Sequence, residues 1–381
     1  MYSRGRNLYP GTLTLRSFFG GQEGQSNDIL YRVTAPIIFP MKKNRDQNVD
    51  IYRGIAIFLV VVGHLYWTES IAALIYSFHL PLFFFMTGFF IKHSAAKYSF
   101  WEYLKSRAQN ILVPYLLALV IYLMLVVAAK LKSESVINII FEFLQVFLLS
   151  SSAAIEEAKY QVYYWFMPLF FVYTIVLFGI YKFAQKYVVW IYVLSVSLAF
   201  LIYSVHNISQ YKSDAVIWGI DKLSFLIPLG MLGSALWERK ANLLRNSHIK
   251  LLFCGLVLLT GIFYKSDLRI LFITNIFLYF VLALNGSIFT ILLSDFLDRN
   301  LSNGLYGLKK LIIFLGQNSM LVYLVHGVVF PLWHGRMGSP EGYSTLFNIT
   351  AIVMTIALTF VVRYFIDVVG FWISKLRSRG L

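Results

Sequence analysis

The sequence predicts an all-α polytopic membrane protein with about ten transmembrane helices. Of its 381 residues 59% are hydrophobic and only 13% are charged, whereas soluble domains have about half apolar and about 25% charged residues. Long apolar runs alternate with short basic segments, which is typical of helices that cross a bilayer. A net charge of +15 would suggest nucleic acid in a soluble protein. Here the basic residues lie between apolar runs, so we expect contacts with membrane lipids and none with nucleic acid.

Apolar stretches near the 20 residues needed to cross the hydrocarbon core are expected as spans. They are residues 50–67, 75–91, 109–130, 163–182, 187–205, 220–237, 249–265, 270–294, 312–333 and 346–373. The apolar stretch 136–150 is shorter and contains Glu142, so an interfacial or re-entrant helix is expected there. Residues 1–40 show no sustained hydrophobic period and are expected to form a flexible tail before a transmembrane domain at 41–381.

The distribution of basic residues predicts the orientation. With the N-terminus inside, most of the 33 lysines and arginines fall in segments on the inner side. The positive-inside rule then places both termini in the cytoplasm and the protein in the cytoplasmic membrane as a multi-pass protein. The single cysteine, Cys254, allows no disulfide within the chain and no thiolate cluster. No zinc-binding spacing and no phosphate-binding glycine loop occurs, so no metal is expected.

The first span carries an arginine near one end and a histidine near the other. Arg53 and His64 are eleven positions apart, almost three helical turns, so they share one face about 16 Å apart along the axis. Ionisable groups inside a span are costly and by default indicate a functional path. The alternative is that Arg53 reaches the headgroups while His64 hydrogen-bonds a neighbouring helix. Asp50 either orients Arg53 or caps the helix at the membrane surface.

Two further spans bring polar side chains to the depth of His64. In the predicted topology His79, on the second span, and His326, on the ninth, reach the same layer of the membrane. Ser319, Tyr323 and His326 share one helical face, because their spacing is i, i+4 and i+7. Three polar groups facing lipid would be costly, so this face is expected to lie inside the bundle. Hydrogen-bonded packing is the alternative to a functional role.

Residues near the ends of two other spans are candidates for ligand binding. Lys105 and Arg107 precede the third span and can hold the phosphates of a nucleotide-like donor; ordinary positive-inside anchoring is the alternative. Trp165 begins the fourth span and can stack on a sugar ring, although tryptophan is also common in interfacial aromatic belts.

These motifs resemble the acyltransferase-3 family of integral-membrane acyltransferases, which includes O-antigen, exopolysaccharide and nodulation-factor O-acetylases. The family's Arg-X10-His pair on the first span is matched by Arg53 and His64. Its F-F-x-x-S-G motif on the second span is matched by residues 83–88, with Thr87 in place of serine. The resemblance covers about residues 45–375.

The two other family motifs are matched less uniformly. R-x-x-R before the third span is matched by Arg107, while Asn110 stands where the second arginine is expected and Lys105 lies nearby. The family's G-x-x-S-l-x-i-Y-l-x-H ending resembles Gly316, Ser319, Tyr323 and His326.

The resemblance implies transfer of an acyl group, commonly acetyl from cytoplasmic acetyl-CoA, to a hydroxyl of a carbohydrate. The acceptor would be an envelope polysaccharide or its lipid-linked precursor. The residues implied for the donor are Arg53, Lys105 and Arg107, and Ser319 and Tyr323 would orient the acceptor. Trp165 and His326 are added as acceptor-binding candidates from their positions in the spans. The implied catalytic residues are His64, Arg53, His79 and Asp50. His64 would act as general base on the acceptor hydroxyl or carry the acyl group transiently, and the sequence leaves both routes open.

Two other functions are compatible with many apolar spans and intramembrane polar groups. A transporter or flippase for a lipid-linked glycan would have broken helices and polar residues at the midplane. It would not explain why Arg53 and His64 share a helical face, and no inverted repeat is visible. A structural subunit of an envelope assembly would need no buried layer of histidines.

Overall fold

The computed structural model describes residues 46–378, apart from residue 66 and the segments 131–134, 150–162, 210–215, 269–270, 302–304 and 338–343. Within this part of the chain regular structure is almost entirely helical, and the sheet is a hairpin of two very short strands. The predicted all-α fold is confirmed. The predicted tail at 1–40 lies outside the described residues.

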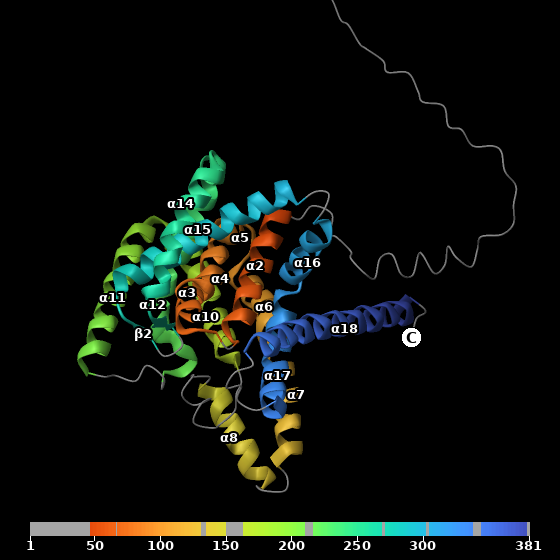
Figure 1. Ribbon diagram of the computed structural model, residues 1–381. Helices are drawn as coiled ribbons and strands as arrows, with labels where there is room; N and C mark the ends of the chain where they lie inside the picture. The colour runs from red at the N-terminus through yellow and green to blue at the C-terminus, as the bar shows by residue number, and fades with distance from the viewer. Residues whose placement is uncertain are drawn as a thin grey trace, which may run out of the picture. The chain divides into compact units, whose positions relative to one another are not determined.

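The helices follow one another along the chain with short breaks (Figure 1). The α-helices are α2 (Gln47–Gly63), α3 (Glu69–Tyr76), α4 (His79–Thr87), α5 (Ile91–Lys97), α6 (Phe100–Arg107), α7 (Val113–Lys130), α8 (Val136–Leu149), α10 (Phe166–Phe183), α11 (Val188–Ser209), α12 (Leu223–Glu238), α13 (Lys240–Leu244), α14 (Ser247–Leu259), α15 (Ile276–Asn300), α16 (Tyr306–Gln317), α17 (Ser319–Met337) and α18 (Ser344–Ser378). The shorter elements are η1 (Gly88–Phe90), the π-helical turn η2 (Ala108–Leu112), η3 (Tyr163–Trp165), η4 (Gln185–Tyr187), η6 (Ile217–Lys222), η7 (Thr260–Phe263), β1 (Ser266–Asp267) and β2 (Phe272–Ile273).

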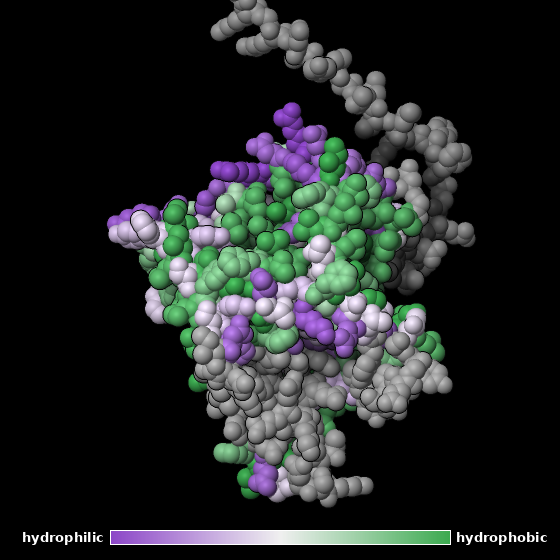
Figure 2. Space-filling view, turned by 60° about the vertical axis from the view of Figure 1, so that its left-hand side comes forward, coloured by the Kyte–Doolittle hydropathy of each residue, from purple (hydrophilic) through white to green (hydrophobic). Residues whose placement is uncertain are grey.

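The helices form a multi-pass membrane protein. Among the described residues seven helical runs are long and apolar enough to cross a membrane, or eight if α16 and α17 form one broken span. The 17-residue α2 and the run Ser247–Phe263 are apolar but shorter. Every predicted span therefore contains a helix, while the count of about ten crossings and the side of the termini stay predictions. In Figure 2 a broad band of hydrophobic side chains lies below a strongly polar rim, as expected of a surface that faces lipid.

The predicted span 312–333 is wrong in one respect, because it is not a single straight helix. α16 and α17 meet at a bend of 86°. Between them Asn318 leaves the helical region, with φ −111° and ψ 23°. The next residue, Ser319, starts α17 and therefore points its helix in a new direction.

The predicted span 270–294 begins too early. Strand β2 occupies Phe272–Ile273, and α15 starts only at Ile276. The side chain of Asn275 caps this helix by accepting hydrogen bonds from the N–H groups of Phe277 and Leu278, at 3.0 and 3.1 Å. This cap satisfies two N–H groups that have no partner within the helix.

Small residues hold α2 against α16. A Cβ atom at Gly54 would collide with the carbonyl of Ile312, and one at Gly316 would collide with the carbonyl of Asp50. Such close backbone contact between helices is typical of membrane proteins, where small residues form the interface. Gln317 Nε2 also donates a hydrogen bond to Asp50 Oδ2 at 3.0 Å. The bend between α16 and α17 is thereby fixed beside α2.

The same kind of packing holds α4 against α12 and α10. A Cβ atom at Gly88 would collide with the carbonyl of Gly230, and one at Gly233 with the carbonyl of Phe85. The hydroxyl of Tyr173, on α10, donates to the carbonyl of Phe84 at 2.8 Å. These contacts fix the face of α4 that carries the F-F-x-x-T-G motif.

Candidate active site

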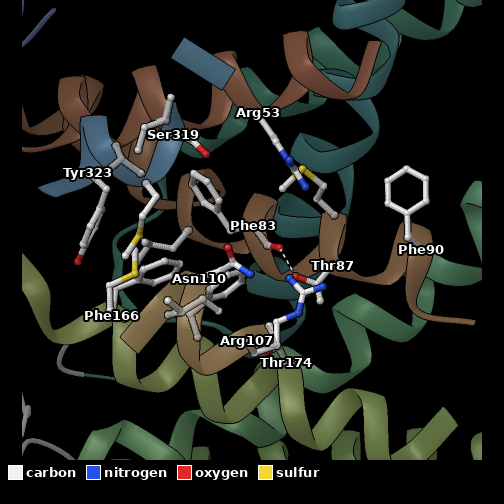
Figure 3. Close-up of a pocket in the computed structure, with 18 of the residues that line it drawn as sticks. Arg53, Phe83, Thr87, Phe90, Arg107, Asn110, Phe166, Thr174, Ser319 and Tyr323 are labelled. Carbon is white, nitrogen blue, oxygen red and sulfur yellow. Dashed lines mark hydrogen bonds between the residues drawn. The ribbon is translucent and has the colours of Figure 1, made fainter. Parts of the chain in front are cut away.

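The described residues enclose a cavity of about 250 Å³ between α2, α4, η2, α10 and α17 (Figure 3). Apolar side chains form most of its wall, including Ile57, Phe83, Phe166 and Met320. Its other lining residues are Arg53, Val60, Leu80, Met86, Thr87, Phe90, Ile91, Ser94, Tyr103, Arg107, Asn110, Ile111, Met167, Phe170, Thr174, Ser319 and Tyr323. We call it the arginine cavity.

Two guanidinium groups point into this cavity from different helices. Arg53 extends into it from α2 and Arg107 from the end of α6 (Figure 3). The Arg107 guanidinium lies 4.7 Å from the ring centroid of Tyr103, and its buried Nε makes no hydrogen bond to the described residues. No aspartate or glutamate is among the described residues that line the cavity. Two guanidinium groups that line a largely apolar cavity favour an anionic ligand.

A π-helical turn shapes the floor of the arginine cavity. η2 follows α6 directly and carries Asn110, which lines the cavity at the position where the resemblance expects a second arginine. Asn110 Nδ2 donates to the carbonyl of Ser106 at 2.6 Å. Single π turns inside α-helices are frequent at functional sites. Lys105 is exposed and does not line the cavity.

His64 and His326 meet at the other end of α2. His64 is the C-terminal capping residue of α2, with φ −91° and ψ 7°. Its ring stacks on that of the buried His326, with centroids 5.4 Å apart and planes inclined by 20°. The Tyr323 ring packs against His326 edge to face at 5.1 Å. The structure thus brings together a residue of the first span and one of the ninth, as the depth argument predicts.

His79 lies next to this pair at the start of α4. It is buried, and its Nδ1 lies 2.8 Å from the carbonyl of Ile75. That contact fits an N–H donor at Nδ1 and leaves a lone pair on Nε2. A Cβ atom at Gly63 would lie 3.7 Å from His79 Nε2, so His79 faces the residue before His64.

The arginine cavity ends close to the histidines without including them. Val60 lines the cavity one helical turn before His64, which is about 6 Å along the axis. Leu80, the neighbour of His79, and Tyr323, which touches His326, also line it. A flexible group bound at the arginines can therefore extend along α2 toward the histidines.

The residues implied for the acceptor are found in two places. Ser319 and Tyr323 line the arginine cavity, together with Arg53. Trp165 is buried in η3 and lines none of this cavity, so its side chain does not belong to an exposed aromatic belt. Its neighbour Tyr164 donates a hydrogen bond to the carbonyl of Leu324 at 2.6 Å, which ties the start of α10 to α17.

Asp50 is not the N-cap of α2, so that alternative is wrong. Asp46 caps the helix by accepting from the N–H of Asn48 at 3.0 Å. Asp50 lies within the first turn, is buried, and accepts the hydrogen bond from Gln317. It does not line the arginine cavity. Its position indicates that it holds α16 and α17 in place beside Arg53.

Sequence reasoning missed several lining residues of the arginine cavity. Tyr103, Phe166, Met167 and Thr174 come from α6 and α10, and no motif marked them. The aromatic run at the start of α10 was the available signal for Phe166. Among the described residues no group of three His, Cys, Asp or Glu side chains is arranged to hold a metal ion.

Comparison with known proteins gives one family and two relatives. The family model described as "Acyltransferase domain" matches residues 46–364. The nodulation protein NolL of Mesorhizobium japonicum is 22% identical over 347 residues, which cover 84% of this chain and 88% of that protein. The nodulation protein NolL of Sinorhizobium fredii is 34% identical over 84 residues, 19% of this chain and 23% of that protein.

Proposed function

The chain belongs to this acyltransferase family and is a multi-pass membrane O-acyltransferase. We propose that it transfers an acetyl group from acetyl-CoA to a hydroxyl of a carbohydrate, and that His64 carries out the chemical step. The observation that carries this proposal is the arginine cavity, which holds two guanidinium groups at one end and stops one turn from His64 at the other. The family match favours the enzyme over the transporter and the structural subunit as the main function.

The arginine cavity suits a donor with phosphates at one end and an acyl thioester at the other. Arginine forms paired hydrogen bonds with phosphate oxygens, and both Arg53 and Arg107 reach the cavity. The apolar wall between them and Tyr323 suits an uncharged arm that carries the acyl group. With a volume of about 250 Å³ the cavity holds this arm, while the nucleotide part of the donor lies outside, near exposed Lys105 and Asn110.

His64 is suited to the chemical step. It is half-buried, and its stacking on His326 fixes the plane of its ring. In the direct route His64 takes the proton from the acceptor hydroxyl, whose oxygen attacks the acyl carbon while the carbon–sulfur bond breaks and the thiolate leaves. In the two-step route the His64 nitrogen takes the acyl group first and the acceptor oxygen displaces it. The Tyr323 ring packs against His326, and His79 faces Gly63, so both rings help to hold this histidine pair in place.

The acceptor and the location are part of the same proposal. We expect the acceptor to be an envelope polysaccharide or its lipid-linked precursor. We also expect the protein to lie in the cytoplasmic membrane, with the arginine cavity open toward the cytoplasm. The basic residues near Arg107 support this orientation through the positive-inside rule.

The test is the O-acyl content of the cell-surface polysaccharide, measured by NMR in a deletion strain. The strain is complemented with wild type or with His64→Ala at equal membrane abundance. Wild type should restore the O-acyl signals and His64→Ala should not. Equal acylation in all strains would contradict the proposal, and loss of the polysaccharide itself would favour the transporter. An acyl label retained on wild type and absent from His64→Ala would favour the two-step route.

A further inference from the structure

A second cavity, of about 230 Å³, lies at the end of α2 that is remote from Arg53. α3 and the β1–β2 hairpin form it. It is lined by Glu69, Ala72, Ala73, Tyr76, Lys265, Ser266, Asp267 and Phe272. It shares no lining residue with the arginine cavity. We call it the hairpin cavity.

We propose that the hairpin cavity binds the sugar ring whose hydroxyl receives the acyl group. The proposal rests on the acyltransferase function proposed above, and it assigns the acceptor to residues outside every motif of the resemblance. The donor and the acceptor then approach the histidines from opposite ends of α2.

The hairpin cavity reaches the histidines through Tyr76. The Tyr76 ring lines the cavity and packs edge-on against the His79 ring, with centroids 5.0 Å apart and planes at 80°. Asp267, on β1, lines the same cavity. Leu80, the residue after His79, lines the arginine cavity. His79 therefore lies between the two cavities.

The two cavities carry different charges, which suit an anionic donor in one and a neutral acceptor in the other. The arginine cavity has two arginines and no lining carboxylate among the described residues. Among the described residues the hairpin cavity is lined by the carboxylates of Glu69 and Asp267 and by one cation, Lys265. Its two carboxylates disfavour a phosphate-bearing ligand, whereas they accept hydrogen bonds from neutral hydroxyls. A neutral carbohydrate fits this cavity better than a nucleotide.

Ser266, Glu69 and Lys265 can offer polar groups to a ligand in the hairpin cavity. Ser266 is 7% exposed, and its hydroxyl, although near that of Tyr264, lacks a hydrogen bond of normal geometry. Glu69 and Lys265 form an ion pair at 2.7 Å, but their side chains are 85% and 63% exposed. Such exposed pairs contribute little to stability, so both groups can turn to sugar hydroxyls.

The size and the aromatic rings of the hairpin cavity also suit one sugar ring. Its volume of about 230 Å³ is below the range of about 300–1,000 Å³ that is typical of pockets for larger ligands. Tyr76 and half-exposed Phe272 offer ring faces to the apolar side of a sugar. The rest of a longer glycan would lie outside.

The transfer step needs only the acceptor hydroxyl, the thioester of the donor and a histidine. The acceptor oxygen forms a bond to the acyl carbon, and the carbon–sulfur bond of the donor breaks. The hydroxyl proton passes to a histidine ring nitrogen and from there to the leaving thiolate. In the direct route this histidine is His64. The contact of His79 Nδ1 with the carbonyl of Ile75 fixes the orientation of the neighbouring ring.

A blocking experiment tests the proposal on the full chain in intact cells. Phe272→Cys places a thiol at the hairpin cavity, and Ser70→Cys places one at an exposed position of α3 that does not line it. The native Cys254 is buried, so wild type gives the background of labelling. Cells are treated with a bulky, membrane-impermeant maleimide and then supplied with ¹³C-acetate. The ¹³C O-acetyl content of the surface polysaccharide is measured by NMR, and the stabilisation of the purified labelled protein by CoA is measured by thermal unfolding.

In cells that carry Phe272→Cys, labelling should lower the O-acetyl signal of the polysaccharide at least tenfold relative to unlabelled cells. The purified labelled protein should still be stabilised by CoA. The labelled Ser70→Cys protein should keep both within twofold. An equal signal from the two labelled variants would overturn the proposal. So would labelling of Phe272→Cys only after the membrane is opened, because the hairpin cavity would then face the cytoplasm.

A second variant covers the case in which Phe272→Cys does not fold. Asp267→Asn, which removes one carboxylate of the hairpin cavity, should lower the O-acetyl signal at least fivefold at an unchanged CoA stabilisation. An unchanged signal would contradict the proposal. If unlabelled wild type shows neither the O-acetyl signal nor CoA stabilisation, the acyltransferase proposal itself fails, which is a different result.

Discussion

The two ends of α2 differ in the chemistry they present. Near its start Arg53 shares a largely apolar cavity with Arg107, and no carboxylate of the described residues lines that cavity. At its end His64 stacks on the buried ring of His326, which also packs against Tyr323. One end is therefore suited to hold an anion, and the other is suited to move a proton or carry a group.

The difference indicates that binding and chemistry are separated along one helix. Eleven positions between Arg53 and His64 correspond to about 16 Å, too far for one small group to touch both. The donor has to be extended, with its anionic part at the arginines and its reactive part at the histidines. Changes at the two ends should accordingly affect different kinetic constants.

The largest effect is expected at the histidine end. His64→Gln keeps a polar side chain but removes the basic ring, and a positioned base contributes about 10²–10⁴-fold to a rate. We expect kcat to fall by that factor while the KM for acetyl-CoA stays within threefold. The measurement is release of free CoA by purified protein in lipid nanodiscs. A large rise in KM at an unchanged kcat would contradict the separation of the two ends.

A smaller effect is expected at the arginine end. Hydrogen bonds to charged groups contribute about 1.5–3 kcal/mol, so Arg107→Gln should raise the KM for acetyl-CoA by about 10–150-fold. The kcat at saturating donor should stay within a few-fold of wild type. Lys105→Gln is the control, because Lys105 is exposed and lies outside the cavity; its KM should rise less than threefold. Equal effects of the two substitutions would show that the cavity does not hold the phosphates.

The difference between the two ends of α2 also depends on the close contact of α16 with α2, which holds α17 in place. Gly316→Ala would place a Cβ atom on the carbonyl of Asp50, whereas Gly307→Ala, also on α16, meets open space. Overpacking costs about 1–3 kcal/mol. Gly316→Ala should therefore lower the thermal unfolding midpoint in detergent, and Gly307→Ala should leave it unchanged or slightly higher. Equal midpoints would show that this contact does not fix the helices.

The smallest effect is a gain at the arginine end. Asn110 lines the arginine cavity where the family resemblance expects an arginine. Asn110→Arg adds a third guanidinium group and should lower the KM for acetyl-CoA by up to tenfold at an unchanged kcat. Asn110→Ala is the matched control and should not lower it. A rise in KM for Asn110→Arg would show that the cavity has no room for a further cation.

The sequence was sufficient where regular helical geometry decides the outcome. The 3.6-residue period places Arg53 and His64 on one face of α2, and hydrophobic length indicates most of the remaining spans. The depth argument correctly brings His326 to His64. Each of these inferences needs only the rise and the turn of an ideal helix.

The sequence was insufficient where the helices depart from that geometry. The π turn at Ala108–Leu112 puts Asn110 into the arginine cavity, and the 86° bend after Gln317 redirects α17. The bend is fixed by the hydrogen bond from Gln317 to Asp50 on another helix. Such breaks depend on tertiary contacts, so local composition did not reveal them.

The most direct test of the central claim is equilibrium binding of CoA by calorimetry to three proteins in nanodiscs: wild type, His64→Ala and Arg107→Gln. If α2 separates donor binding from chemistry, His64→Ala should bind CoA as tightly as wild type, within threefold, although it transfers no acyl group. Arg107→Gln should bind at least tenfold more weakly. Loss of CoA binding in His64→Ala, or wild-type binding in Arg107→Gln, would contradict the account.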